Sequence, residues 1–267
     1  MSYAVILLGI IFLWYLLARL ATRIIFRPQK KRWPLKLPFT TVHSGPLVGI
    51  YLAARPGKAT LVFFHGRGGN VSHFENFALA YAPLGYGILM LDYRGFGLSQ
   101  GTPSQKHLQE DALSTVRYAL DTLQIPPQNV VLYGHSLGNA CALFAAQHFK
   151  NLPLKALILQ SPFLSTPDMA ASWATHAYQP KAWKYRFIRA FVTPFLWFNR
   201  FDNTRLTPGL KLPVLLCTSK ADVTLPWPQS AKLADGILHV ERFLSPAGGH
   251  DEFNWAAPAA DKFLSSL

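Results

Sequence analysis

Cysteine and acidic residues are both scarce in this chain of 267 residues. The two cysteines, Cys141 and Cys217, lie in apolar stretches, so we expect small buried side chains rather than a disulfide or a metal site. Acidic residues number 13 against 26 lysines and arginines, and none precedes Glu75. The excess positive charge comes without zinc-ligand spacing, a helix-turn-helix or an RNA-binding aromatic signature. We therefore expect no nucleic-acid partner and favour an anionic membrane surface.

The N-terminus is the longest apolar run. Residues 3–18 carry no charge, and the apolar character continues to Phe26, which is long enough to span a membrane if Arg19 and Arg23 reach the interface. A cleaved secretory signal is the alternative, but no basic residue precedes the run and no small-x-small site follows it. We expect an uncleaved anchor over residues 1–26 that contacts membrane lipid, followed by a basic linker over residues 27–38. The positive-inside rule then predicts a single-pass protein with its main domain on the cytoplasmic side.

Residues 39–267 have the length of one large domain and alternate short apolar runs with longer helical stretches. This alternation predicts an α/β fold with a mostly parallel sheet flanked by helices. An antiparallel opening pair and six further strands are expected at residues 41–42, 47–53, 60–64, 88–91, 130–133, 156–160, 214–218 and 238–243. Helices are expected at residues 71–82, 104–123, 137–149, 228–233 and 252–264.

The pentapeptide GHSLG occupies residues 134–138, between a predicted strand and a predicted helix. This is the pattern of a nucleophile elbow, in which a strand turns sharply into a helix and strains the backbone of the central serine. Side chains at Gly134 or Gly138 would collide with the neighbouring strand or helix. The pattern predicts that Ser136 is the nucleophile of a serine hydrolase at the carboxyl edge of the sheet. Haloalkane or epoxide chemistry would need a carboxylate at this position.

An acid and a histidine should follow the serine in chain order. Asp222 lies on a short loop after the predicted strand 214–218, and His250 follows the last predicted strand within the sequence AGGHD. We expect His250 to accept the proton of Ser136, and Asp222 to fix the tautomer of the imidazole. A turn-capping role for Asp222 and a triad role for Asp251 are the alternatives, but a carboxylate next to the histidine in sequence would point away from the ring in most loops.

A glycine-rich loop, HGRGGN at residues 65–70, directly follows a predicted strand. We expect the backbone amides of Arg67 and Leu137 to form an oxyanion hole, with a plain tight turn as the alternative role of the loop. His65 is expected to brace the loop through hydrogen bonds. In the sequence DYRG at residues 92–95, the Asp and the Arg are expected to pair with each other, with substrate contact as the alternative.

The motifs HGRGGN, DYRGFGLSQG, GHSLGNA and GGHDEF, together with Asp222, resemble the α/β-hydrolase-domain serine hydrolases over about residues 40–267. The chain is most similar to their membrane-anchored branch, which includes acylglycerol lipases and protein depalmitoylating thioesterases. The resemblance implies an α/β-hydrolase fold, an ester or thioester substrate, and the same site residues: Ser136, Asp222 and His250, with the amides of Arg67 and Leu137. Arg67 departs from the small or amide side chain of many relatives, so this cation either favours anionic acyl substrates or points to solvent.

The segment over residues 163–212 is too long for an ordinary connection and predicts a cap over the site. Many of its aromatic residues are interleaved with basic ones, namely Trp173, Tyr178, Trp183, Tyr185, Phe187, Phe191, Phe195, Trp197, Phe198 and Phe201 with Lys181, Lys184, Arg186, Arg189 and Arg200. This composition favours either a face that lies against the bilayer and admits acyl chains or a cap core packed on itself.

These features together predict a serine hydrolase that cleaves carboxylic esters or thioesters of lipid-like acyl substrates through an acyl-Ser136 intermediate. The chemistry requires no metal and no organic cofactor. Two alternatives stay open at this point. One is an aminopeptidase or amidase that uses the same triad, and the other is a non-catalytic membrane-anchored scaffold.

Overall fold

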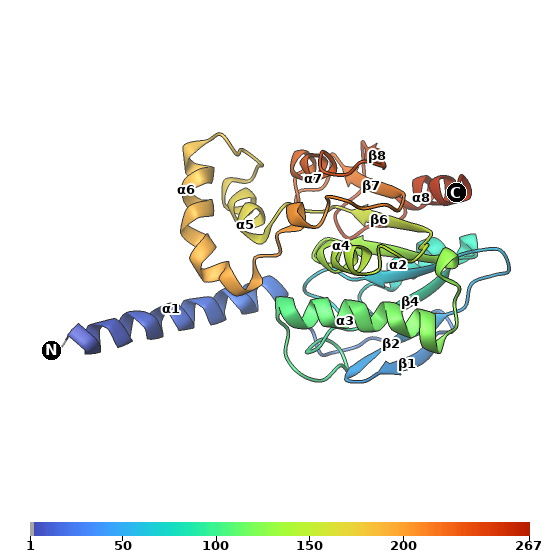
Figure 1. Ribbon diagram of the computed structural model, residues 1–267, viewed down its shortest axis with the longest axis horizontal. Coiled ribbons are helices and arrows are strands. Elements are labelled where there is room, and N and C mark those ends of the chain that lie inside the picture. Colours follow the sequence, from blue (N-terminus) through green and yellow to red (C-terminus); the bar gives the residue numbers. More distant parts are fainter. Residues whose placement is uncertain (1–2) are drawn as a thin grey trace.

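The computed structural model describes residues 3–267, and eight strands in it form one twisted sheet (Figure 1). The strands are β1 (Thr40–Ser44), β2 (Leu47–Leu52), β3 (Thr60–Phe64), β4 (Gly87–Leu91), β5 (Val130–His135), β6 (Ala156–Gln160), β7 (Val214–Ser219) and β8 (Val240–Ser245). They are ordered β1-β2-β4-β3-β5-β6-β7-β8, and every pair is parallel except β1 with β2 and β2 with β4. The predicted mostly parallel sheet is therefore confirmed.

Helices cover both faces of the sheet, which explains why strands β3 to β7 are buried along their whole length. One face packs against α3 (Gln105–Arg117), α4 (Gly138–His148) and α7 (Trp227–Ala234), and the other against α2 (Glu75–Tyr81) and α8 (Ala257–Ser265). Both cysteines are free and buried in these two layers, as expected from their apolar surroundings.

Two helices begin later than the sequence predicts, because a polar side chain closes a turn in front of each. The helix predicted from residue 71 begins at Glu75, since the Asn70 side-chain oxygen accepts a hydrogen bond from the Ser72 amide at 3.0 Å. The helix predicted from residue 252 begins at Ala257, since the Glu252 carboxylate accepts the Gly249 amide at 3.0 Å.

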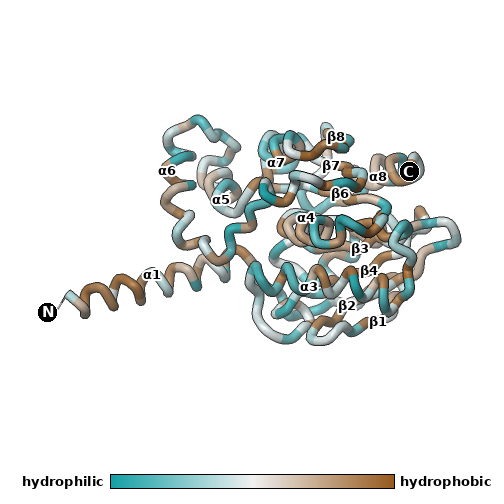
Figure 2. The backbone as a smooth tube through the Cα atoms, in the orientation of Figure 1, coloured by the Kyte–Doolittle hydropathy of each residue, from teal (hydrophilic) through white to brown (hydrophobic). Residues whose placement is uncertain are grey.

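Helix α1 (Tyr3–Phe26) projects from the rest of the domain and is long and apolar enough to cross a membrane (Figures 1 and 2). Met1 and Ser2 of the expected anchor lie outside the described residues. The end of the helix belongs to the domain core, because Ile25 and Phe26 are 4% and 0% exposed. The basic segment over residues 27–38 forms neither helix nor strand and follows the domain surface.

A helical insertion separates β6 from β7. It contains α5 (Thr166–Thr175), α6 (Trp183–Val192) and the 3₁₀ segments η4 (Thr193–Asn199) and η5 (Asn203–Arg205). We call this insertion, residues 163–212, the cap. Figure 1 shows α5 and α6 standing beside α1 rather than over the centre of the sheet, and η4 packs directly on α1.

The aromatic residues of the cap range from buried to exposed, with Trp173, Tyr178 and Phe195 half-buried. Tyr185 and Phe201 are buried, as a cap packed on itself would require. Five others are between 62% and 78% exposed: Trp183, Phe187, Phe191, Trp197 and Phe198. All five of these exposed side chains lie on α6 or η4, so internal packing accounts for only part of the aromatic content.

Candidate active site

The turn between β5 and α4 is a tight elbow at the carboxyl edge of the sheet. Ser136 has a φ of 52°, a left-handed conformation that non-glycine residues rarely adopt. A Cβ atom at Gly138 would lie 1.9 Å from the Phe64 carbonyl oxygen, and one at Gly134 would lie 2.6 Å from the Asn139 Cα. Any side chain at Gly134 or Gly138 would therefore clash with the backbone, because α4 runs directly against β3 and β5.

Asn139 holds the elbow in place from the first turn of α4. Its side-chain amide donates to the carbonyl oxygens of Ser136 at 2.9 Å and of Gln160 at 2.8 Å. The Ser136 amide donates to the same Gln160 carbonyl at 3.1 Å. The strained serine is thus held by both the strand next to it and the helix behind it.

Ser136, His250 and Asp222 form a continuous chain of hydrogen bonds. The Ser136 Oγ lies 2.9 Å from the His250 Nε2, and the His250 Nδ1 lies 2.7 Å from the Asp222 Oδ2. The other carboxylate oxygen of Asp222 accepts the amides of Thr224 at 2.9 Å and Leu225 at 2.8 Å. These contacts orient the carboxylate toward the ring, so that His250 carries its proton on Nδ1 and offers Nε2 to the serine.

The pKa of Asp222 reflects two opposing effects. Burial raises the pKa of this carboxyl group, while hydrogen bonding and the positive charge of a protonated His250 lower it, and the net direction is downward. Asp222 is therefore ionised at neutral pH and stabilises an imidazolium beside it.

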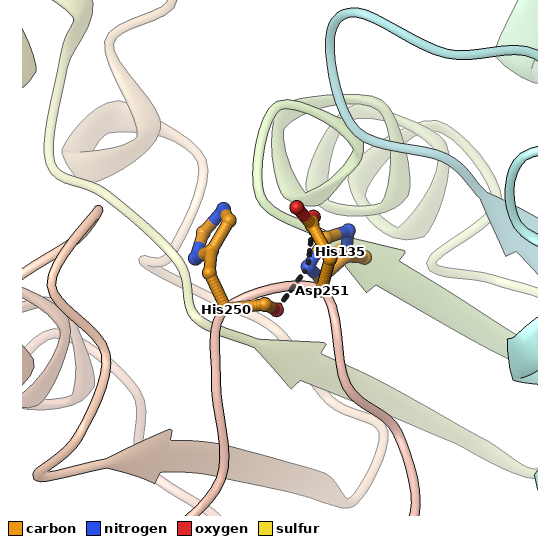
Figure 3. A group of neighbouring side chains, drawn as sticks. All are labelled: His135, His250 and Asp251. Atoms are coloured by element: carbon orange, nitrogen blue, oxygen red, sulfur yellow. Dashed lines mark hydrogen bonds and ion pairs between the residues drawn. The ribbon is translucent and has the colours of Figure 1, made fainter.

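The loop that carries His250 is fastened on several sides. The His135 Nε2 donates to the His250 carbonyl oxygen at 2.8 Å, which Figure 3 shows as a dashed line. The Gln160 side-chain amide donates to the Glu252 carbonyl at 2.7 Å, and the Ser219 hydroxyl donates to the Gly248 carbonyl at 2.7 Å. The strands β5, β6 and β7 therefore each contribute one hydrogen bond that positions the histidine.

His135 is the neighbour of the serine inside the pentapeptide, and its ring is completely buried. Burial lowers the pKa of His135 to about 4, so the ring is neutral at physiological pH. The Asp251 carboxylate lies 3.8 Å from the His135 Nε2 (Figure 3) and is mostly exposed. Asp251 thus sits next to His135, while Asp222 holds the Nδ1 of His250.

One donor atom each from His135, His250 and Asp251 lie within 4.8 Å of one another. A metal ion there would compete with hydrogen bonds that the imidazoles already make, from the His135 Nε2 to the His250 carbonyl and from the Ser136 hydroxyl to the His250 Nε2. These side chains are arranged for hydrogen bonding rather than as a prepared set of metal ligands.

The glycine-rich loop lies directly beside Ser136, since a Cβ atom at Gly66 would be 3.3 Å from the Ser136 Cβ. Two residues further along the loop, the Gly68 amide donates to the Phe26 carbonyl at 3.1 Å. Within residues 3–267 the amides of Arg67 and Leu137 donate to no group, so the two amides predicted for an oxyanion hole are unpaired. Leu137 also precedes the N-terminus of α4, where the helix dipole favours negative charge.

The Arg67 side chain points away from the serine, toward α1 and the cap. Its Nη1 donates to the Ile24 carbonyl at 2.9 Å, and its guanidinium lies 4.4 Å from the centre of the Trp173 ring. Trp173 in turn donates its indole N–H to the Thr224 carbonyl at 2.7 Å, on the loop that carries Asp222. Arg67 and Trp173 therefore link the glycine-rich loop, α1, the cap and the loop that carries Asp222.

The expected pair between Asp92 and Arg94 is wrong. Strand β4 ends at Leu91, so Asp92 and Arg94 lie in the turn that follows it and do not share a face as two residues of one strand would. Asp92 turns inward, accepting the Val71 amide at 2.7 Å and approaching the His65 Nε2 at 3.6 Å, whereas Arg94 donates to Asp111 at 2.7 Å on α3. His65 braces the loop as predicted, with its Nδ1 2.8 Å from the Gly66 carbonyl.

A profile of the alpha/beta hydrolase fold family matches residues 59–201, more than half of the chain. The chain belongs to this family. Protein YfhR of Escherichia coli K12 is 29% identical over 92% of this chain and 85% of its own. Lysophosphatidylserine lipase ABHD12 of Danio rerio is 30% identical over 78% of this chain and 57% of its own. An alpha-beta hydrolase structure from Vibrio vulnificus superposes with a TM-score of 0.69 at 25% identity, covering 86% of this chain and 80% of the other. Family membership supports hydrolase activity.

Several residues that position the site are not predicted from the sequence pattern. Asn139 and Gln160 fix the elbow and the histidine loop, and Trp173 lies between the cap and both loops. Asn139 and His135 stand inside the serine motif, so their places beside the nucleophile were a usable signal. Gln160 ends a buried apolar strand as its only polar residue, which also marks it. Trp173 gives no such signal, because its partners are distant in sequence.

Proposed function

We propose that this protein is a serine hydrolase that cleaves carboxylic ester or thioester bonds of lipid-like acyl substrates. The observation that carries the proposal is the chain of hydrogen bonds from Ser136 through His250 to Asp222, at 2.9 Å and 2.7 Å. A scaffold protein has no physical need for this alignment together with a strained serine and two unpaired amides beside it. The name of the lipase relative supports an acyl ester substrate.

In the first half-reaction, the Ser136 oxygen attacks the carbonyl carbon while the His250 Nε2 takes the hydroxyl proton. The carbonyl oxygen becomes an oxyanion that accepts hydrogen bonds from the amides of Arg67 and Leu137. Collapse of the tetrahedral intermediate breaks the bond to the leaving alcohol or thiol, and His250 gives its proton to that group. Asp222 stabilises the imidazolium throughout.

In the second half-reaction, water attacks the acyl-Ser136 ester and gives a proton to His250. Collapse of this second intermediate releases the carboxylic acid, and the proton returns to the Ser136 oxygen. Each amide and side chain has the same role as in acylation, because the two steps pass through oxyanions at the same place.

The location we propose follows from α1 and from the charge next to it. Helix α1 anchors the protein by a single pass, and the six basic residues between Arg19 and Arg32 keep its C-terminal end on the cytoplasmic side. The hydrolase domain then lies at the cytoplasmic membrane surface, with membrane lipid as its contact and no nucleic-acid partner.

Labelling with a fluorophosphonate tests the proposal on the full-length protein in detergent. We expect stoichiometric labelling of Ser136, loss of labelling in Ser136→Ala, and a decrease of at least about 10⁴-fold in kcat toward p-nitrophenyl butyrate. The matched control is Ser114→Ala on the surface of α3, which should label like the wild type. A folded wild-type protein that neither labels nor hydrolyses the ester would refute the proposal and favour the scaffold.

A further inference from the structure

A deep apolar cavity of about 580 Å³ lies between α1 and the cap. Its walls include Leu17, Ala21 and Ile24 from α1, and Ala170, Trp173 and Phe195 from the cap. The membrane helix is therefore a wall of a cavity in the hydrolase, and not only a tether. Such a cavity has the size and the lining that are typical of small-molecule sites in proteins.

We propose that this cavity binds the acyl chain of a membrane lipid, and that the chain enters it from the hydrocarbon core of the bilayer along α1. This inference rests on the proposed serine hydrolase function. It adds the place of the acyl chain, the source of the substrate and a direct role of the anchor in substrate binding.

Two residues of the cavity wall contact Arg67 of the glycine-rich loop. Trp173 lines the cavity, and its ring stacks on the guanidinium of Arg67, whose amide borders Ser136. Ile24, on the opposite wall, accepts the hydrogen bond from the same guanidinium at 2.9 Å. In the proposed complex, the carboxyl end of the acyl chain lies at this end of the cavity and passes Arg67 and Trp173 toward Ser136.

The volume of the cavity fits one long chain. A methylene group occupies about the volume of a water molecule in the liquid, about 30 Å³, so a sixteen-carbon chain needs about 480 Å³. The cavity of about 580 Å³ holds one such chain and has no room for two. The substrate class is therefore a lipid that places a single long acyl chain in the enzyme.

The length of α1 indicates that the cavity opens at membrane depth. The ring of Phe198 in η4 lies 6.0 Å from that of Trp14, so the cap runs along α1 as far as this residue. Residues 3–13, which precede the contact, rise only about 16 Å at about 1.5 Å per residue, whereas the hydrocarbon core is about 30 Å thick. A spanning α1 therefore draws the adjoining part of the cap into the apolar region.

The exposed aromatic residues of the cap are consistent with this depth. Phe187 and Phe191 on α6 are 64% and 62% exposed, and Phe191 also lines the cavity. Figure 2 shows apolar backbone along α1 and along part of α6. A side chain that is costly to expose to water is favourable in contact with lipid tails, so Phe191 at the cavity and Phe187 one turn away on α6 form a lipid-compatible surface.

A second crevice of about 600 Å³ lies on the other side of Trp173. It is lined by Lys220, Asp222 and Thr224 among others, and is therefore more polar than the first cavity. It suits the polar part of a lipid and the leaving group better than an aliphatic chain. This crevice is the alternative place for the acyl chain, and the experiments below separate the two.

Filling the cavity tests the proposal. We expect Ala21→Trp and Ala170→Trp to lower kcat/KM for p-nitrophenyl palmitate by about tenfold or more, because the added indole takes the volume of the chain. Hydrolysis of p-nitrophenyl butyrate and fluorophosphonate labelling should stay within about twofold, because the butyryl chain is too short to reach the filled region. The matched control is Ala4→Trp, on the exposed face of the same helix, which should change neither rate.

The outcomes distinguish this proposal from the function on which it rests. An unchanged palmitate rate in both filled variants, or an equal loss of both esters with labelling retained, would overturn the cavity proposal alone. A wild-type protein with no labelling and no butyrate hydrolysis would overturn the proposed function.

A second measurement on the wild-type protein does not depend on whether the variants fold. A fluorophosphonate with a hexadecyl chain and a terminal diazirine is bound to the protein in phosphatidylcholine vesicles and then irradiated. We expect the phosphonate on Ser136 and the photochemical crosslink on residues 17–25 or 166–174. Crosslinks confined to the second crevice, near Val223 and Trp227, would overturn the proposal.

Discussion

The sheet and the cap contain the same kinds of aromatic residue and place them in opposite environments. In the core, Phe77 is fully buried, and its ring stacks on Phe63 with 3.9 Å between the centroids. In the cap, Phe187 also stacks on a neighbour, Phe191, but the two side chains are more than 60% exposed. Aromatic side chains of the core pack against other residues of the chain, whereas the exposed ones of the cap are suited to contact with something outside it. The difference separates the part of the molecule that performs chemistry from the part proposed to meet the membrane.

The largest difference between the two regions should be the effect on kcat of replacing a buried aspartate in each. Replacement of the triad acid, Asp222→Asn, should lower kcat toward p-nitrophenyl butyrate by about 10⁴-fold, because an amide no longer stabilises the imidazolium or fixes its tautomer. Asp168→Asn in the cap, where the carboxylate pairs with Arg189 at 2.6 Å, should change the rate by less than about threefold. Steady-state kinetics with the short ester measure both.

Asp251→Asn is the control for the assignment of the acid, because this carboxylate is next to His250 in sequence. It should retain nearly full activity, since Asp251 approaches His135 and not the Nδ1 of His250. If Asp251→Asn lowered kcat as much as Asp222→Asn does, the assignment of Asp222 as the acid would be wrong.

The aromatic comparison itself is tested by one substitution in each region. Phe77→Ala should destabilise the protein by about 3–5 kcal/mol, because it leaves a cavity in the sheet core. Phe187→Ala should change the stability in detergent by less than about 0.5 kcal/mol, because its ring is 64% exposed. Thermal unfolding monitored by circular dichroism measures both, and equal effects would remove the distinction between the regions.

The smallest effect concerns a buried pair of titratable groups in the core. Burial raises the pKa of Asp92 to about 7 and lowers the pKa of His65 to about 4. Between about pH 5 and 6 the folded pair holds about one proton, on Asp92, and the unfolded chain also holds about one, on the histidine, whose ordinary pKa is 6.5. The pair therefore adds almost no pH dependence to stability in this range.

Asp92→Asn should reveal how much His65 contributes to the pH dependence of the stability. His65 stays neutral in the folded variant, while the unfolded histidine takes up a proton below its ordinary pKa, so the variant loses stability as the pH falls. We expect about 2 kcal/mol of additional loss, relative to wild type, between pH 6.5 and pH 5. Denaturant unfolding at these two pH values measures the difference.

The control for this pH effect is Asp235→Asn, because the exposed Asp235 has a lowered pKa through its hydrogen bond with Lys232. This variant should follow the wild-type pH profile above pH 5. Parallel profiles for wild type and Asp92→Asn would contradict the proton balance assigned to the buried pair.

Much of the sheet could be predicted from the sequence, because its signal is local. Strands β3 (Thr60–Phe64) and β6 (Ala156–Gln160) have the predicted bounds, since each is a continuous apolar run that both helical layers cover. Strand β8 (Val240–Ser245) lies two residues beyond its prediction. It is an edge strand with a half-exposed, charged sequence, so the apolar pattern defines its bounds poorly.

The serine, histidine and acid were also accessible from the sequence, because chain order and strand ends locate them. The placement of side chains between distant segments was not accessible in the same way. The sequence predicts that the Arg67 side chain points either to the substrate or to solvent. It does neither, since it contacts Ile24 of α1 and Trp173 of the cap, which are distant in sequence. Asp92 likewise pairs with a residue 27 positions earlier, His65, rather than with the arginine beside it.

The burial of the end of α1 also affects how a water-soluble form of the protein can be produced. A truncated chain that begins after Phe26 would lack two core side chains, Ile25 and Phe26, and would leave the Gly68 amide without its carbonyl acceptor. Arg67 would lose the Ile24 carbonyl at the same time, next to the nucleophile. A truncation that removes the first part of α1 and keeps a native domain should therefore begin at Leu17. The start of the basic segment, which the sequence pattern alone would suggest, is too late.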